Sequence, residues 1–148
     1  MAVEFIPYKP WHAIQMDWID KDEFEGCLRR SPQYFQLLMM DEPWTMVRGD
    51  EILAIVLTKE MMAHHLYVNL FMGKAIQKNF DKEIYKTMKD FIARVTATYD
   101  RVSGEAKASN EKLNKMMTWL GFEKEGLMRK YGDNKEDYYM YAIIREDD

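Results

Sequence analysis

Cysteine, proline and glycine are scarce in this sequence, and long hydrophobic runs are missing. Its 148 residues include one cysteine, four prolines and seven glycines. Cys27 is the only thiol, so no internal disulfide can form, and we expect a small apolar side chain in a reducing compartment. No apolar run approaches the ~20 residues that cross a bilayer, and residues 1–15 lack the features of a signal peptide. The sequence therefore predicts a soluble cytoplasmic protein without a membrane partner.

The sequence also lacks an excess of positive charge, internal repeats and linkers. The formal net charge is −4, which argues against broad nucleic-acid binding through phosphates. Aromatic residues make up 14% of the chain, but basic residues do not interleave with them as a nucleobase-stacking surface requires. Without a linker rich in glycine, serine or proline, we predict a single domain over residues 1–148 and no nucleic-acid partner.

The first half of the chain predicts a strand, helices and then three consecutive strands. Alternating and helical apolar spacings define most of these elements, and the pair Gly49-Asp50 between two β-rich runs predicts a hairpin turn. We expect one helix face to carry Trp11, Ile14 and Trp18. The predicted ranges are a strand at 3–8, a helix at 11–19, a two-piece helix at 20–38 broken at Ser31-Pro32, hairpin strands at 44–48 and 51–59, and a strand at 66–72.

The second half predicts two helices that alternate with strands. Apolar residues from Phe80 to Val95 recur on one face of a long helix. Asn110 is a suitable N-cap for a shorter one, and Gly121 stands where a C-cap glycine belongs. The predicted ranges are a helix at 79–99, a strand at 101–106, a helix at 110–120, and a closing strand pair at 122–128 and 137–144. This order predicts an α/β (α+β) fold: a mixed, mostly antiparallel sheet with helices on both faces.

The C-terminal part of the sequence resembles a known superfamily. The segment NEKLNKMMTWLGFEKEG has an Asn (Asn110) that opens an apolar helix, followed by Gly121-Phe122 before a strand, and DYYMYAIIRED reads as a closing strand. With the element order, these features make residues 44–145 similar to the GNAT superfamily of acyl-CoA-dependent N-acyltransferases. The tail LGFEKEGLMRKYGD also resembles the GNAT-like internal virion proteins of T7-like tailed phages.

The resemblance implies where a cofactor would bind. In the superfamily the pantetheine arm of acetyl-CoA lies beside a splayed strand, here residues 67–73. The pyrophosphate lies at the following loop and helix start, where backbone N–H groups favour anions; the loop is expected at 74–81. The implied cofactor-binding residues are Phe71, Met72, Gly73, Lys74, Gln77, Lys78, Asn79, Asn110 and Met117.

Two features of the superfamily are missing from this sequence. The loop pattern Gln/Arg-x-x-Gly-x-Gly/Ala lets the backbone approach the phosphates, but counting from Gln77 its glycine positions hold Phe80 and Lys82. Lys74, Lys78 and Lys82 either compensate as phosphate-binding charges or form a solvated helix start. Met117 occupies the position of the tyrosine that many members use to protonate the leaving thiolate, and a thioether cannot donate a proton.

The sequence does not identify a general base. Glu60 and Glu105 are candidates on strands beside the expected cleft, although either fits equally well as a solvated carboxylate. Asn69 is the polar residue of an otherwise apolar strand and either lines the substrate side or bonds a neighbouring backbone group. His64 and His65 are adjacent but have no third ligand at a suitable spacing, so we expect no metal site.

These observations leave two hypotheses. The first is an N-acetyltransferase that uses acetyl-CoA and acts on an amine-bearing substrate, either a small molecule or a protein. The second is a catalytically degenerate GNAT-like protein with a structural or binding role, with protein partners or virion components, found in the host cytoplasm or the virion if a phage encodes it.

Overall fold

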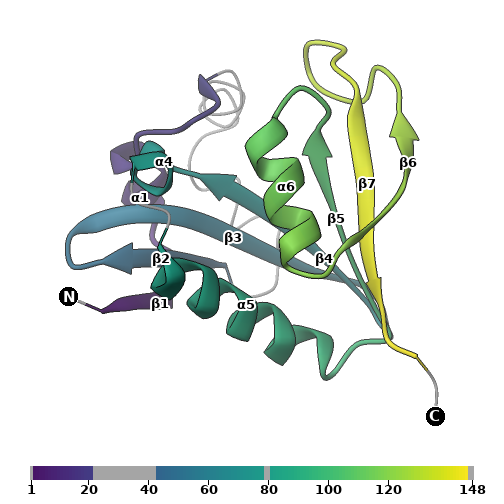
Figure 1. The fold of residues 1–148 in the computed structure, drawn as a ribbon, viewed down its shortest axis with the longest axis horizontal. Helices are drawn as coiled ribbons and strands as arrows, with labels where there is room; N and C mark the ends of the chain where they lie inside the picture. Colours follow the sequence, from purple (N-terminus) through teal and green to yellow (C-terminus); the bar gives the residue numbers. More distant parts are fainter. Residues whose placement is uncertain (1, 22–42, 79–80, 147–148) are drawn as a thin grey trace. The chain divides into compact units, whose positions relative to one another are not determined.

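The computed structural model describes residues 2–21, 43–78 and 81–146, with only the backbone of Gln77 and Lys78 (Figure 1). Cys27, Asn79 and most of the predicted two-piece helix at 20–38 lie outside the described residues. Among the described helices, none is long and apolar enough to span a membrane.

Seven strands form one mixed, mostly antiparallel sheet, as the sequence predicts. Its strand order is β1-β2-β3-β4-β5-β7-β6. The β4–β5 pair is parallel, whereas the pairs β1–β2, β2–β3, β5–β7 and β6–β7 are antiparallel. The strands are β1 Val3–Pro7, β2 Trp44–Arg48, β3 Glu51–Met62, β4 His65–Met72, β5 Arg101–Lys107, β6 Glu123–Met128 and β7 Tyr138–Ile144. The helices are α1 Pro10–Gln15, α4 Lys74–Lys78, α5 Lys82–Thr96 and α6 Glu111–Trp119.

The chain divides into two compact units, and β3, β4 and α5 each contribute residues to both. The first unit comprises Met1–Lys59 and Asn69–Met88, and the second comprises Glu60–Val68 and Lys89–Asp148.

The core of the first unit corrects the prediction of a helix at 11–19. Helix α1 ends at Gln15, because Met16 is already extended at ψ 135°. Trp18 instead forms an isolated antiparallel bridge with Gly73, and its indole N–H donates to the carbonyl of Ala13 at 2.8 Å. Trp18 is buried, whereas Trp11 is about half exposed, so these two side chains do not share a buried face. The core cluster contains Tyr8, Ala13, Met16, Trp18, Ile55, Leu57 and Phe71.

The second unit is built on β5, which pairs with β7 along its whole length. Neighbouring residues of a strand point to opposite faces, so Ser103 and Glu105 share one face and Gly104 faces the other way. Helix α6 packs on the Gly104 face: a Cβ built on Gly104 would lie 3.2 Å from Met117 Cε. That Cβ would also lie 2.9 Å from the carbonyl oxygen of Val68, so only glycine allows β4 and β5 to approach this closely.

Candidate functional site

Glu105 lies at the centre of a hydrogen-bonded group in the second unit. Its Oε1 accepts a hydrogen bond from the Tyr67 hydroxyl at 2.5 Å, and its Oε2 accepts one from the Tyr131 hydroxyl at 2.9 Å. Each carboxylate oxygen is thus held by a different tyrosine, one from β4 and one from the β6–β7 loop. Two other elements of the second unit thus hold the Glu105 carboxylate.

The register of the β4–β5 pair explains why Tyr67 meets Glu105. Tyr67 pairs with Ser103, and Glu105 follows Ser103 by two residues, so all three side chains lie on one face of the sheet. One step earlier on the same face, His65 Nε2 lies 2.6 Å from Ser103 Oγ. The result is a polar row across two strands, and we call the group of Tyr67, Glu105 and Tyr131 the Glu105 cluster.

Both tyrosines of the cluster are held in their protonated form. Burial, reinforced by the neighbouring Glu105 carboxylate, raises the pKa of Tyr67 far above its usual value. The same two causes, burial first, raise the pKa of Tyr131 to about 12. The hydroxyls therefore act as hydrogen-bond donors at neutral pH, and Glu105 is the acceptor of the cluster.

Sequence reasoning missed Tyr67 and Tyr131. Tyr67 alternates with apolar residues of β4, and this spacing shows that it points away from the apolar face without indicating its partner. Tyr131 reaches Glu105 because the β6–β7 loop folds back toward β5, and such a return cannot be inferred from local sequence patterns.

Asn110 and Met117 belong to helix α6, as predicted. Asn110 is the N-cap, since its side-chain oxygen accepts a hydrogen bond from the Leu113 N–H at 3.1 Å. Met117 is buried beside Gly104, on the face of β5 opposite to Glu105. Asn110 therefore has a structural function whether or not it contacts a cofactor.

We expect Asn110→Ala to lower the free energy of unfolding by about 1 kcal/mol, because the Leu113 N–H loses its acceptor. Urea unfolding followed by circular dichroism measures this change. Asn110→Ser retains a capping oxygen and is the matched control, so an equal loss in both variants would contradict the capping role.

The remaining candidates show no comparable arrangement. Glu60 is exposed on β3 and accepts a hydrogen bond from the Tyr99 hydroxyl at 3.3 Å, and Asn69 is a partly buried residue of β4. His64 lies in the β3–β4 turn, where its Nδ1 is 3.5 Å from an Asp100 carboxylate oxygen. Across residues 2–21, 43–78 and 81–146, no group of three His, Cys, Asp or Glu side chains could hold a metal ion.

The first unit contains the predicted cofactor residues from Phe71 to Lys78. Phe71 and Met72 are buried at the end of β4, and Gly73 follows them. On one side, the Gly73 N–H donates to Leu53 of β3. On the edge of this segment that faces away from β3, the Met72 carbonyl accepts from the Ile19 N–H at 3.0 Å. The Lys74 N–H donates to the Asp17 carbonyl at 2.7 Å. This backbone edge is therefore already occupied by residues 17–19 of the same chain.

The segment predicted to be a phosphate loop is partly helical. Residues 74–78 form α4, and α5 begins at Lys82 instead of residue 79. Asp81 Oδ1 accepts a hydrogen bond from the Ile84 N–H at 3.0 Å, as an N-cap residue does. Helix α5 therefore begins at Lys82, after the Asp81 cap, and α4 is a separate helical turn before it.

Asp81 also belongs to an ion-pair cluster, which we call the Arg48 cluster. The Arg48 guanidinium lies 2.7 Å from Asp81 Oδ2 and 3.2 Å from Glu83 Oε1. The Ile84 N–H first, and then Arg48, lower the pKa of Asp81, so this carboxylate is ionised at neutral pH. An anionic side chain of the chain itself thus occupies the helix end where the superfamily binds pyrophosphate.

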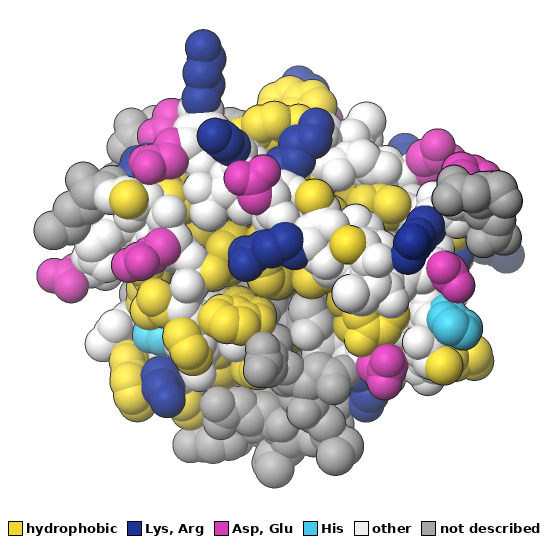
Figure 2. Space-filling model, turned by 90° about the horizontal axis from the view of Figure 1, so that it is seen from below, with side chains coloured by type: hydrophobic (Ala, Val, Ile, Leu, Met, Phe, Trp, Pro, Cys, Tyr) yellow, Lys and Arg dark blue, Asp and Glu magenta, His cyan; other side chains and the backbone are white. Residues whose placement is uncertain are grey.

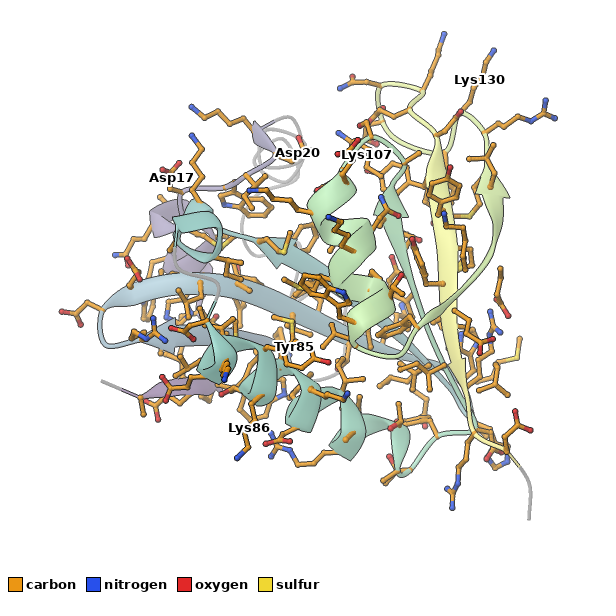
Figure 3. The ribbon with its side chains drawn as sticks, viewed as in Figure 1. Asp17, Asp20, Tyr85, Lys86, Lys107 and Lys130 are labelled. Atoms are coloured by element: carbon orange, nitrogen blue, oxygen red, sulfur yellow. The ribbon has the colours of Figure 1, made fainter. Side chains whose placement is uncertain are left out.

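Basic side chains are available around this helix end. Lys82 is exposed, and the Lys74 ammonium lies 3.9 Å from a carboxylate oxygen of Asp17, which Figure 3 shows beside α4. Figure 2 shows Lys and Arg side chains interspersed with Asp and Glu on the face that it displays. The start of α5 therefore does not fit a diphosphate in the manner of the superfamily, whereas the lysines fit it as separate charges.

Comparison with known proteins identifies the fold. No protein-family model matches the sequence, and neither does any curated protein. Three solved structures that match are acetyltransferases. The ribosomal-protein-S5-alanine acetyltransferase from Vibrio fischeri is 19% identical, with a TM-score of 0.65 over 99% of this chain and 95% of that chain. An acetyltransferase of the GNAT family from Bacillus anthracis is 12% identical, with a TM-score of 0.69 over 97% of this chain and 95% of that chain.

The third structure is RimL, the ribosomal L7/L12 alpha-N-protein acetyltransferase, in complex with coenzyme A. It is 14% identical, with a TM-score of 0.65 over 97% of this chain and 94% of that chain. At these identities the similarity shows that the chain has the fold of GNAT acetyltransferases, as the strand order and the tail of the sequence predict.

Proposed function

We propose that this protein is an N-acetyltransferase that transfers the acetyl group of acetyl-CoA to an amine. The observation that carries the proposal is the Glu105 cluster, a carboxylate fixed by two tyrosyl hydroxyls on one strand of a GNAT fold. The matched structures support it, because RimL binds coenzyme A and the Vibrio fischeri protein is named for an acetyl transfer to a ribosomal protein.

Glu105 is the proposed general base. An acceptor amine must lose a proton to become a neutral nucleophile, and a carboxylate within hydrogen-bond reach can take that proton. The hydroxyls of Tyr67 and Tyr131 hold the two carboxylate oxygens in place, so that the free lone pairs of Glu105 have a defined direction. Both tyrosines are positioning residues in this scheme.

Glu105 and Met117 lie on opposite faces of β5, and α6 packs on the Met117 face. In an acyl transfer, the attacking amine and the departing thiolate are bonded to the same carbon, so Glu105 can act only on an acetyl group that reaches its own face of β5. Met117 cannot protonate the thiolate, so the proposal assigns it packing alone.

The residues of the first unit that would hold acetyl-CoA are Lys74, Lys78 and Lys82. When bound, the cofactor supplies an activated acetyl group as a thioester. Because Asp81 caps α5, the lysines would bind the diphosphate as screened point charges, and we propose that coenzyme A affinity is correspondingly weak.

The second candidate is a degenerate GNAT-like protein that does not transfer acetyl groups. The Arg48 cluster at the start of α5 is the specific observation that favours it, because a carboxylate there opposes pyrophosphate binding. The narrower version, a phage internal virion protein, rests on the degenerate loop, the small size and the tail of the sequence, and the three matched structures lend it no support.

One pair of measurements separates the candidates. We expect a calorimetric titration with acetyl-CoA to show binding that weakens as salt is added, and a thiol-release assay with peptide amines to show turnover. A protein whose melting temperature does not change in millimolar coenzyme A, and which releases no thiol above background, would contradict the enzyme proposal.

A further inference from the structure

The β6–β7 loop combines a contact to Glu105 with two cationic side chains that have no ion-pair partner among the described residues. The loop follows Met128 and leads into Tyr138. It carries Tyr131, which donates to Glu105. Arg129 and Lys130 come immediately before Tyr131 and line a cavity of about 540 Å³. Consecutive residues of one loop therefore line the cavity and contact the proposed general base.

Three other cations of the second unit near these strands are already engaged. Arg101 pairs with Glu125 at 2.6 Å, Lys107 lies 3.7 Å from Glu136, and the Lys124 ammonium lies 3.8 Å from the centre of the Tyr139 ring. Within the described part of the chain, neither the Arg129 nor the Lys130 side chain has an ion-pair partner. These two charges are thus available to a ligand.

The loop holds its shape through its own hydrogen bonds. Lys130 has a φ of 54°, a backbone conformation that residues other than glycine seldom adopt. Its N–H donates to Asp137 Oδ1 at 3.0 Å, and the N–H groups of Tyr131 and Gly132 both donate to the Glu136 carbonyl. Figure 3 shows Lys130 at the tip of this loop. A loop fixed in this way presents its charges without a large ordering cost on binding.

We propose that the loop selects acceptors that carry an anionic group close to the reactive amine, such as a peptide with acidic or phosphorylated residues after its free N-terminus. The inference rests on the proposed function and names its substrate class. Arg129 supplies a planar fork that matches a carboxylate or a phosphate, and Lys130 adds a second positive charge.

The net negative charge of the chain means that any attraction for acidic peptides must be local. At a net charge of −4, the protein as a whole repels acidic peptides. A preference for them must therefore come from local groups, and Arg129 and Lys130 are the unpaired cations at this cavity. Neutral or basic peptides would gain nothing from these side chains.

The test is peptide binding by calorimetry, with and without coenzyme A present. Short peptides with free N-termini carry Asp-Glu, Asn-Gln, phosphoserine or serine after the first residue. We expect the two anionic peptides to bind roughly 5- to 10-fold more tightly than their neutral counterparts. The double variant Arg129→Gln/Lys130→Gln should remove this difference. Lys135→Gln changes the charge of the same loop by one, outside the cavity lining, and should leave the difference in place.

Each outcome has a separate meaning. Equal binding of anionic and neutral peptides, no binding of any peptide, or an equal effect of Lys135→Gln would overturn the inference. A larger difference for the phosphoserine pair than for the carboxylate pair would identify phosphate as the recognised group. If anionic peptides bind through Arg129 and Lys130 but no acetyl transfer occurs, the recognition of anionic peptides by the loop stands, and the proposed function and the role of these peptides as acceptors fail.

Discussion

Replacing Glu105 with glutamine should lower kcat/KM for acetyl transfer by about 100-fold or more. The amide keeps the size of the side chain. Its oxygen can accept from one of the two tyrosines and its NH2 group can donate to the hydroxyl oxygen of the other, but the amide cannot take a proton from the acceptor amine. A well-placed general base commonly contributes about 10²- to 10⁴-fold. The thiol-release assay measures this loss, and calorimetry should show unchanged coenzyme A binding, because Glu105 is not among the residues proposed to hold the cofactor.

Glu60→Gln is the matched control. Glu60 is also a carboxylate of the second unit that accepts a hydrogen bond from a tyrosine, in this case Tyr99, and its side chain is exposed on β3. We expect its activity to remain within about 3-fold of the unchanged protein, as for a surface substitution away from the site. Equal losses in both variants, or full activity of Glu105→Gln, would show that another group or water accepts the proton.

The fold was predictable where short local signals agree with the packing. The pair Gly49-Asp50 marks the β2–β3 turn, where Gly49 has a φ of 61°. Asn110 caps α6, and Gly121 ends it with a φ of 100°. In each case the residue type is required by a backbone conformation or an orphan N–H within a few residues, so no distant contact was needed to predict it.

The prediction was wrong where distant residues compete with local spacing. Trp18 fits a helix by its spacing, yet it pairs with Gly73, which lies 55 positions later in the chain, and its burial outweighs one more helical turn. The division between α4 and α5 likewise follows from the cap by Asp81, whose charge is balanced by Arg48 on β2. Spacing within one element cannot reveal such pairs.

For the candidate site, the sequence named Glu105 but could not rank it above Glu60. The two carboxylates differ in the hydrogen-bond partners that the fold brings to them. Glu105 meets Tyr67 through the strand register and Tyr131 through the return of the β6–β7 loop, and both relations depend on tertiary structure. For the segment predicted to bind the cofactor, the sequence showed that the glycines are missing, but it did not show that Asp81 caps α5.

Asp81→Asn should tighten coenzyme A binding by roughly 5- to 10-fold at low salt. Asparagine caps a helix about as well as aspartate, so the Ile84 N–H keeps its acceptor and the melting temperature should stay nearly unchanged. The substitution removes a negative charge from the end of α5, where the N–H groups favour an anion. It also removes one of the two carboxylate partners of Arg48 and leaves Glu83 at 3.2 Å, so more of the guanidinium charge is available to a phosphate. Calorimetric titration at two salt concentrations measures the change.

Asp90→Asn makes the same charge change on an exposed position further along α5. It should alter coenzyme A affinity by less than about 2-fold, because exposed charges separated by more than about 8 Å are screened at physiological ionic strength. Equal tightening in both variants would mean that overall charge, and not the cap, limits binding. If Asp81→Asn binds no better than the unchanged protein, the diphosphate does not approach the start of α5. Lys82, the first residue of α5, would then lose its proposed role.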